Sequence, residues 1–377
     1  MNFTLFNILS IVILFQLVLL ILFLFTSKKG KKVSNQILGF FFLVLAVNIG
    51  DGVLSIAGFF EKFPQWAHVE DGFILLLGPL LYFYTCSVIY RNFSFRRKDV
   101  FHLLPFVLIT VSLLSFYHSQ SAEKKQLIES AVVRRDLPPA FYIIAALVYV
   151  HVLIYLVAAF QKVLSYRDEI RQKFSSIEKI NLDWLIFLLL SITLILLGSW
   201  VNVMIPVTGA RDWFDYSLLI IIIILFLFIN VVVFKGLRQP EIFAGLNVEP
   251  VAPTRDPSFV ASETIFIQNK LRGLVSDQKL FLDPELSLDI LAEKTGISSR
   301  KLSQFINATY KKNFFDFVNS FRIEEAMRIL RESQDPGLTV LEAMYQSGFN
   351  SKSSFNTLFK KATGMTPSAY RRQYRSS

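Results

Sequence analysis

Cysteine and histidine are scarce in this 377-residue chain, which has one cysteine and four histidines. A single cysteine cannot form a disulfide within the chain, and Cys86 lies inside an apolar run. So few of both residue types predict no metal site and no cofactor. The H-E-x-x-H, G-x-S-x-G and glycine-rich phosphate-loop patterns are also missing. The sequence therefore gives little support to an intramembrane enzyme, and we expect no catalytic activity.

Charged residues make up only 18% of the chain, whereas hydrophobic residues make up 53% and include 38 phenylalanines. The mean hydropathy is +0.48. This composition is typical of a protein with several membrane spans, and the length favours two domains. A net charge of +10 favours an anionic partner, either lipid headgroups or nucleic acid.

The first 235 residues contain seven runs that are long and apolar enough to cross a hydrocarbon core of about 30 Å as helices. We predict spans at Leu5–Phe25, Ile37–Phe59, Gly72–Tyr90, Val100–Phe116, Ala140–Phe160, Leu185–Ile205 and Tyr216–Phe234. The loops after spans one, three and five hold 13 Lys/Arg residues, against six on the opposite side. This bias predicts that the amino terminus lies outside and the carboxyl terminus in the cytoplasm.

Polar residues inside membrane spans are candidates for function because they are costly to bury in lipid. Asp51 and Asn48 lie one turn apart on the same helix face, and Asn202 is a weaker candidate. Two interpretations stay open: hydrogen bonds between helices that hold the bundle together, or a site for a small-molecule ligand or proton.

The composition changes after the last span. Residues 236–258 contain four prolines and no helical or strand period, which predicts a linker. Residues 259–377 carry 17 Lys/Arg against 12 Asp/Glu and no spanning run. We therefore predict three parts: a transmembrane domain at 1–235, the linker, and a soluble, basic, mainly helical domain at 259–377.

This last domain contains an imperfect repeat. The copies are "SLDILAEKTGISSRKLSQFINATY" and "TVLEAMYQSGFNSKSSFNTLFKKATG", and each predicts a short helix, a turn and a second helix. Gly296 and Gly348 stand where a helix-turn-helix needs a left-handed residue, which glycine adopts without a Cβ penalty. The capping residues agree, with Thr339 and Glu342 forming a capping box. Between the copies we predict one longer helix at Phe315–Ser333.

The second helix of each copy is predicted to be amphipathic. The expected buried stripes are Leu302, Phe305, Ile306 and Thr309 in the first copy, and Phe355, Leu358, Phe359 and Ala362 in the second. The outer faces carry residue types that suit base edges and phosphates. The candidate DNA-binding residues are Arg300, Gln304, Asn307, Lys352, Asn356, Lys360 and Lys361.

At this level of detail, residues 285–374 resemble the DNA-binding domain of AraC-type transcription regulators. The segment "GFNSKSSFNTLFKKATGMTPSAYRR" carries most of the resemblance, and Arg322 and Ala326 also agree. Two positions depart from the pattern: Met344 replaces a small alanine, and Lys311 replaces a usual glycine. The resemblance implies two helix-turn-helix units joined by a linker helix, binding double-stranded DNA often as a homodimer and working with RNA polymerase.

Together these observations predict an all-α protein, with a seven-helix transmembrane bundle followed by a cytoplasmic domain of two helix-turn-helix units. The expected function is a membrane-embedded, one-component transcription regulator in the bacterial inner membrane, whose bundle senses an unknown signal. The alternative is a seven-span receptor or transporter whose basic helical tail binds a protein or anionic lipid.

Overall fold

The computed structural model describes residues 5–90, 92–135, 137–178, 180–210, 212–238, 261–333, 335 and 337–375. These residues form helices and no strand, which confirms the all-α prediction. The chain separates into two compact units: unit 1 comprises Met1–Leu164 and Asp183–Glu249, and unit 2 comprises Ser165–Leu182 and Pro250–Ser377. The second unit thus takes in a segment from between the fifth and sixth predicted spans.

All seven predicted runs coincide with segments of the described chain that are long and apolar enough to cross a membrane. Three of these segments include short 3-10 or π helices at one or both ends. In chain order, the first two segments are α1 (Leu5–Thr26) and α2 (Lys32–Ile56). The third comprises η1 (Pro64–Trp66), η2 (Asp71–Phe73) and α4 (Ile74–Ile89), and the fourth comprises η3 (Arg97–Leu103), α5 (Leu104–Leu113) and η4 (Leu114–His118). The last three are α7 (Pro139–Lys173), α8 (Asp183–Met204) with η5 (Ile205–Thr208), and α9 (Trp213–Arg238).

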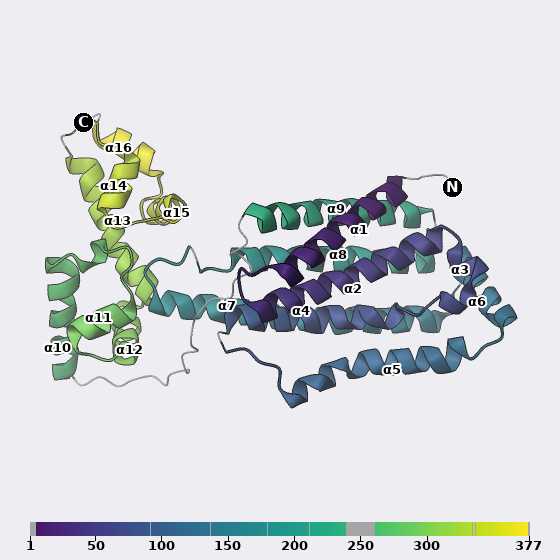
Figure 1. Cartoon of the computed structure of the whole chain (residues 1–377). Coiled ribbons are helices and arrows are strands. Elements are labelled where there is room, and N and C mark those ends of the chain that lie inside the picture. Colours follow the sequence, from purple (N-terminus) through teal and green to yellow (C-terminus); the bar gives the residue numbers. More distant parts are fainter. Residues whose placement is uncertain are drawn as a thin grey trace. The chain divides into compact units, whose positions relative to one another are not determined.

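Neighbouring helices of unit 1 pack as antiparallel or crossing pairs, and α1 contacts both α2 and α9 (Figure 1). Polar side chains tie several of these pairs. Gln16 donates a hydrogen bond of 3.1 Å to Asn230 between α1 and α9, and Ser87 donates one of 2.9 Å to Ser34 between α4 and α2. Hydrogen bonds of this kind hold helices together where lipid provides no hydrophobic driving force.

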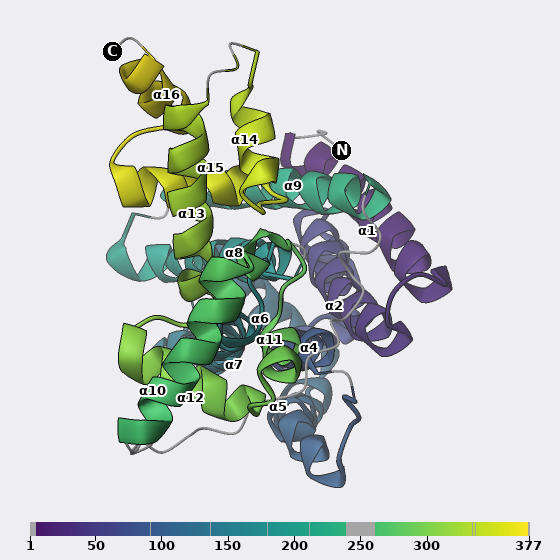
Figure 2. The same ribbon diagram turned by 90° about the vertical axis from the view of Figure 1, so that its left-hand side faces the viewer.

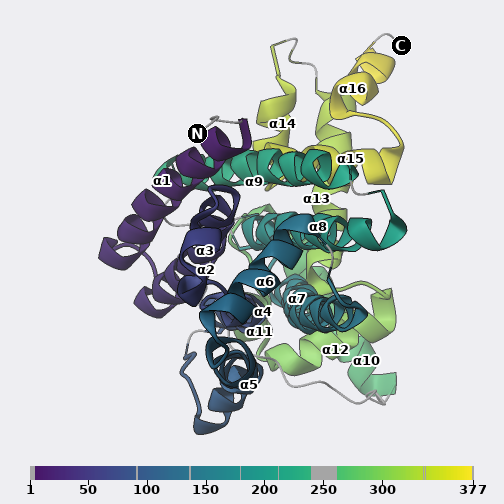
Figure 3. The ribbon, with the colours of Figure 1, turned by 90° about the vertical axis from the view of Figure 1, so that its right-hand side faces the viewer.

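One end of unit 1 is closed by short helices outside the long apolar segments. These are α3 (Phe59–Lys62) and α6 (Ala122–Arg134), which contact each other. Figure 3 views the bundle from this end. The side chain of Ser121 accepts a hydrogen bond from the backbone of Lys124 and caps α6. This end of the bundle holds the polar cluster described below.

Unit 2 is a set of short helices around one longer one (Figure 2). Its helices are α10 (Ala261–Leu271), η7 (Arg272–Asp277), η8 (Leu280–Leu282), α11 (Leu288–Thr295), α12 (Ser299–Tyr310), α13 (Phe314–Glu332), α14 (Val340–Gln346), α15 (Lys352–Thr363) and α16 (Pro367–Arg375). Two hydrophobic cores form, one around α10 to α12 and one around α14 to α16. Because α13 supplies Phe317 to the first core and Ala326 to the second, it joins the two halves.

The predicted linker at 236–258 overlaps α9, which continues to Arg238. The rest of it lies outside the described residues, so the linker stays a prediction.

Candidate nucleic-acid interface

The first helix-turn-helix unit consists of α11 and α12. Gly296 ends α11 with φ +66°, as the sequence predicts, and lets the chain turn without a Cβ penalty. Ser287 caps α11 and Ser298 caps α12, each accepting a backbone N–H three residues ahead. Three side chains of α12 are fully buried against the first core, namely Leu302, Phe305 and Ile306. This packing fixes which face of α12 points away from the core.

The second unit consists of α14 and α15 and repeats the arrangement. Thr339 and Glu342 form the predicted capping box at the start of α14, and Ser351 caps α15. Gly348 has φ +86°. A Cβ at Gly348 would lie 2.7 Å from the carbonyl oxygen of Phe281, so this turn is also where the second half packs on the first.

The helix α13 carries a buried arginine between the two halves. Arg322 is 1% exposed, and its guanidinium donates to the carbonyl oxygens of Phe281 (2.7 Å) and Asp283 (2.7 Å). It also donates to Asn319 at 3.3 Å and to both oxygens of Ser175. Burial lowers the pKa of Arg322 to about 10, so the group stays charged at neutral pH. A buried cation needs such a set of acceptors, and here they come from the chain before α11, from α13 itself and from the segment at Ser175.

The candidate DNA-binding residues lie on the outer faces of the second helices. Arg300 on α12 is exposed, while Gln304 and Asn307 are half-buried. On α15 all four candidates are exposed: Lys352, Asn356, Lys360 and Lys361. Each helix therefore presents cationic and amide groups away from its core, and these groups can donate to phosphates and base edges.

Two details of the predicted stripes are wrong. Thr309 and Ala362 are exposed, because the last turn of each helix extends beyond the core.

The two departures from the family pattern are accommodated. Met344 is 1% exposed within the second core, and Lys311 adopts the left-handed conformation itself, with φ +54°. The turn after α12 therefore keeps its geometry without a glycine.

No local sequence pattern predicts that the end of α7 contacts α12. Gln172, at the end of α7, accepts hydrogen bonds from Ser303 (3.1 Å) and Asn307 (3.0 Å). Ser175 is 1% exposed and contacts Asn319 and Arg322. These pairs lie more than 130 residues apart in the chain, so no local pattern could reveal them.

The three polar candidates of the apolar helices do not form one site. Asn48 lines a cavity of about 680 Å³, and Asp51 lines a neighbouring pocket of about 490 Å³. Asn202 lines neither and donates instead to the carbonyl of Phe214 (2.8 Å) and to Ser217 (2.6 Å), where it ties α8 to α9. Of the two interpretations left open, helix packing fits Asn202.

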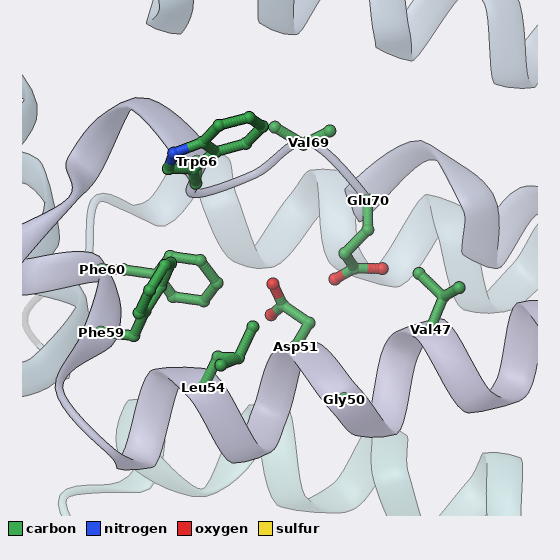
Figure 4. A pocket seen from close by; sticks show the side chains of 9 residues that line it. All are labelled: Val47, Gly50, Asp51, Leu54, Phe59, Phe60, Trp66, Val69 and Glu70. Carbon is green, nitrogen blue, oxygen red and sulfur yellow. The ribbon is translucent and has the colours of Figure 1, made fainter. Parts of the chain in front are cut away.

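The pocket at Asp51 combines carboxylates with aromatic rings. Figure 4 shows the carboxylates of Asp51 and Glu70 facing each other, with the rings of Phe59, Phe60 and Trp66 at one side. Glu70 also lines the larger cavity and therefore joins the two.

A second polar group lies at the same end of the bundle. The His68 ring lies 2.8 Å from Asp71 and 3.2 Å from Glu129, and Tyr117 donates to Glu129 at 2.6 Å. Glu129 comes from α6 and is 5% exposed, so this network fastens α6 to the bundle. Within the described residues, no group of side chains is suited to hold a metal ion.

Comparison with known proteins identifies the C-terminal region. Residues 291–373 match the family "Helix-turn-helix domain". An uncharacterized HTH-type transcriptional regulator of Staphylococcus aureus is 30% identical over 114 residues, which cover 30% of this chain and 15% of that protein. The HTH-type transcriptional regulator GlxA of Rhizobium meliloti is 27% identical over 126 residues, covering 33% of this chain and 37% of that protein.

A third relative, an uncharacterized HTH-type transcriptional regulator of Pseudoalteromonas carrageenovora, is 29% identical over 92 residues, covering 24% of this chain and 52% of that protein. The alignments thus span well under two thirds of each relative. No solved structure matches the chain significantly. The region at 291–373 is a helix-turn-helix domain of the AraC type, and the resemblance seen in the sequence is confirmed for this part of the chain.

Proposed function

We propose that this chain is a one-component transcription regulator embedded in the bacterial inner membrane, which binds specific DNA sequences through its two helix-turn-helix units. One observation carries the proposal: an AraC-type helix-turn-helix domain and seven apolar helices of spanning length occur in a single chain. A DNA-binding domain is useful only where it reaches the chromosome. The Lys/Arg bias of the loops supports this topology, because it favours a cytoplasmic carboxyl terminus.

The outer faces of α12 and α15 are proposed to enter the major groove. Arg300 and Lys352 suit guanine edges or phosphates, whereas Asn307 and Asn356 suit adenine. Two recognition helices on one face of a duplex reach successive major grooves when they lie about 34 Å apart. A functional binding site should therefore contain two short elements separated by about one turn of DNA.

The apolar bundle is proposed to sense a signal. The cavity at Asn48 and the pocket at Asp51 support this role, because both place polar groups beside a large apolar surface. A small or lipophilic molecule held there would have to favour one state of the bundle over another in order to change DNA occupancy.

The DNA-binding part can be tested with the intact chain in phosphatidylcholine nanodiscs, which offer no anionic lipid. The nanodiscs are incubated with a library of random-sequence duplexes, and the bound duplexes are amplified and sequenced over several rounds. We expect enrichment of one motif with two elements about 10 base pairs apart. Enrichment without any shared motif would instead favour the receptor or transporter whose basic tail binds another anionic partner.

Matched variants assign the binding to the proposed faces. Lys352→Ala and Lys360→Ala should weaken binding to the selected duplex, because each removes a cation from the outer face of α15. Arg331→Ala removes a cation from an exposed position on α13 and serves as the control. Equal losses in all three variants would mean that overall charge, and not the α15 face, determines affinity.

A further inference from the structure

The helix α7 is much longer than a membrane span requires. It contains 35 residues, whereas about 20 cross a hydrocarbon core. Its last turns and the loop that follows belong to the same compact unit as the helix-turn-helix domain, which includes Ser165–Leu182. One continuous helix therefore connects an apolar segment of unit 1 with the DNA-binding unit. Residues 172–176, at the end of this helix, are called the docking segment below.

The docking segment is anchored at the joint between the two halves of unit 2. The backbone N–H of Ser175 donates to the carbonyl of Leu286, and Phe174 pairs with Ser287 in an isolated antiparallel bridge. The Ser175 carbonyl accepts from Asn319 at 3.0 Å and from Arg322 at 3.1 Å. The Ser175 hydroxyl also accepts from Arg322, at 2.9 Å.

These contacts are specific and buried. Arg322 makes five hydrogen bonds, and two of them go to Ser175. Ser175 and Arg322 are each 1% exposed and Asn319 is 3% exposed. A buried cation whose acceptors are partly supplied by a distant segment holds that segment in a defined position.

The same segment also reaches both proposed recognition helices. Gln172 accepts from Ser303 and Asn307, which lie four residues apart on the outer face of α12. Ser176 donates a hydrogen bond of 2.8 Å to Asn350, which directly precedes the cap of α15. The bond to Gln172 takes up one of the two N–H donors of the Asn307 amide, and the Gln172 side chain covers the outer face of α12 between Ser303 and Asn307, where DNA would have to lie.

We propose that the docking segment is a built-in inhibitor: while it is docked, it competes with DNA for the outer face of α12. This inference rests on the proposed function only in taking DNA as the competing ligand. Release of the segment frees Ser303 and Asn307 for DNA. Because α7 is itself one of the apolar helices, a movement of α7 along its axis would pull on the segment directly. The inhibitor thereby links the signal to DNA occupancy.

A disulfide that locks the segment in place tests the proposal. Residues opposite each other in an antiparallel bridge have Cα atoms about 4.5–5.5 Å apart, which is within the range that a disulfide spans. The double variant Phe174→Cys/Ser287→Cys is made in the full chain, where the one native cysteine, Cys86, is buried. The intact protein is placed in phosphatidylcholine nanodiscs and oxidised, and disulfide formation is measured by mass spectrometry.

Binding is then measured to the duplex that the unaltered protein selects from the random library. We expect oxidation to weaken binding by about tenfold or more, and a reductant to restore it. The single variant Phe174→Cys, treated with the same oxidant, should not change. If the oxidised double variant binds as tightly as the reduced one, or more tightly, the segment does not inhibit. If no disulfide forms, the docked geometry itself is wrong.

A single substitution provides an independent arm. Gln172→Ala removes both acceptor contacts to α12, and we expect about fivefold tighter DNA binding or more, from the loss of two competing hydrogen bonds. Gln161→Ala, at an exposed position of the same helix, is the control and should bind like the unaltered protein. Unchanged or weaker binding by Gln172→Ala would overturn the inhibitor. Disulfide formation is measured without DNA. If no duplex is selected from the library, that result counts against the proposed function, whereas the disulfide still shows whether the segment is docked.

Discussion

Gly348 offers a sharp test of how the two helix-turn-helix halves fit together. Its backbone has φ +86°, a conformation that costs an L-residue about 1–2 kcal/mol. In addition, a Cβ at this position would lie 2.7 Å from the carbonyl oxygen of Phe281, 2.8 Å from the Cα of Leu282 and 2.9 Å from its carbonyl oxygen. All three are backbone atoms of the other half, so no side chain can turn aside to make room.

Gly348→Ala should therefore carry two costs. The left-handed backbone contributes about 1–2 kcal/mol, and forcing an extra methyl group into a packed joint contributes about 1–3 kcal/mol. The expected loss of stability is about 2–5 kcal/mol. Gly296→Ala is the matched control, because Gly296 has φ +66° but its Cβ would meet no atom closer than 4.0 Å. We expect it to lose only the backbone contribution of about 1–2 kcal/mol.

Hydrogen–deuterium exchange of the intact protein in nanodiscs measures this difference locally. Peptides covering residues 280–330 and 340–363 should exchange faster in Gly348→Ala, because the joint between the halves opens. In Gly296→Ala, faster exchange should stay near α11 and α12. Equal effects of the two substitutions would refute the close approach of Gly348 to Phe281 and Leu282.

Three further predictions concern unit 2. Arg322→Ala should destabilise it by about 3–5 kcal/mol, since several buried acceptors lose their donor. Lys294→Ala, at an exposed position of α11, should change stability by at most about 0.5 kcal/mol. Chemical denaturation of the intact protein measures both. Hydrogen bonds from Arg328 lower the pKa of Glu325 to about 2, from 4.5 in the unfolded chain. The ionised Glu325 carboxylate therefore stabilises the fold above pH 4.5, and this stabilisation is lost as the pH falls from about 4.5 toward 2. Glu325→Gln should flatten the dependence of stability on pH in that range. Asn356→Ala should relax base preference at one position of the selected motif, whereas Lys360→Ala should weaken all sequences alike and reduce the salt slope by about one; sequencing and salt titration separate the two.

Local features of unit 2 were largely predictable from the sequence. The helix predicted at Phe315–Ser333 is α13 at Phe314–Glu332, and Gly296 and Gly348 have the left-handed backbone that the turns require. The capping box of Thr339 is also present. These features depend on neighbouring residues, through capping, turn chemistry and helical periodicity. The apolar runs were predictable for the same reason, because composition over about 20 residues decides them.

Contacts between distant segments were not predictable. The docking of Ser175 beside Arg322 joins residues 147 positions apart, and neither residue breaks a local pattern. Likewise, nothing in the sequence near His68 points to Glu129 in α6. The exposure of Thr309 and Ala362 shows a related limit. Helical periodicity gives the direction of a side chain, but the extent of the core decides whether anything covers it.

The most direct test of the account is to crosslink DNA to the full chain in living bacterial cells, isolate the membranes and sequence the DNA that stays attached to the protein. We predict a small set of genomic sites, recovered with the membrane fraction, that share one motif of two elements about 10 base pairs apart. Uniform genome coverage, or recovery of the chain and its DNA only from the soluble fraction, would contradict the proposal of a membrane-embedded regulator.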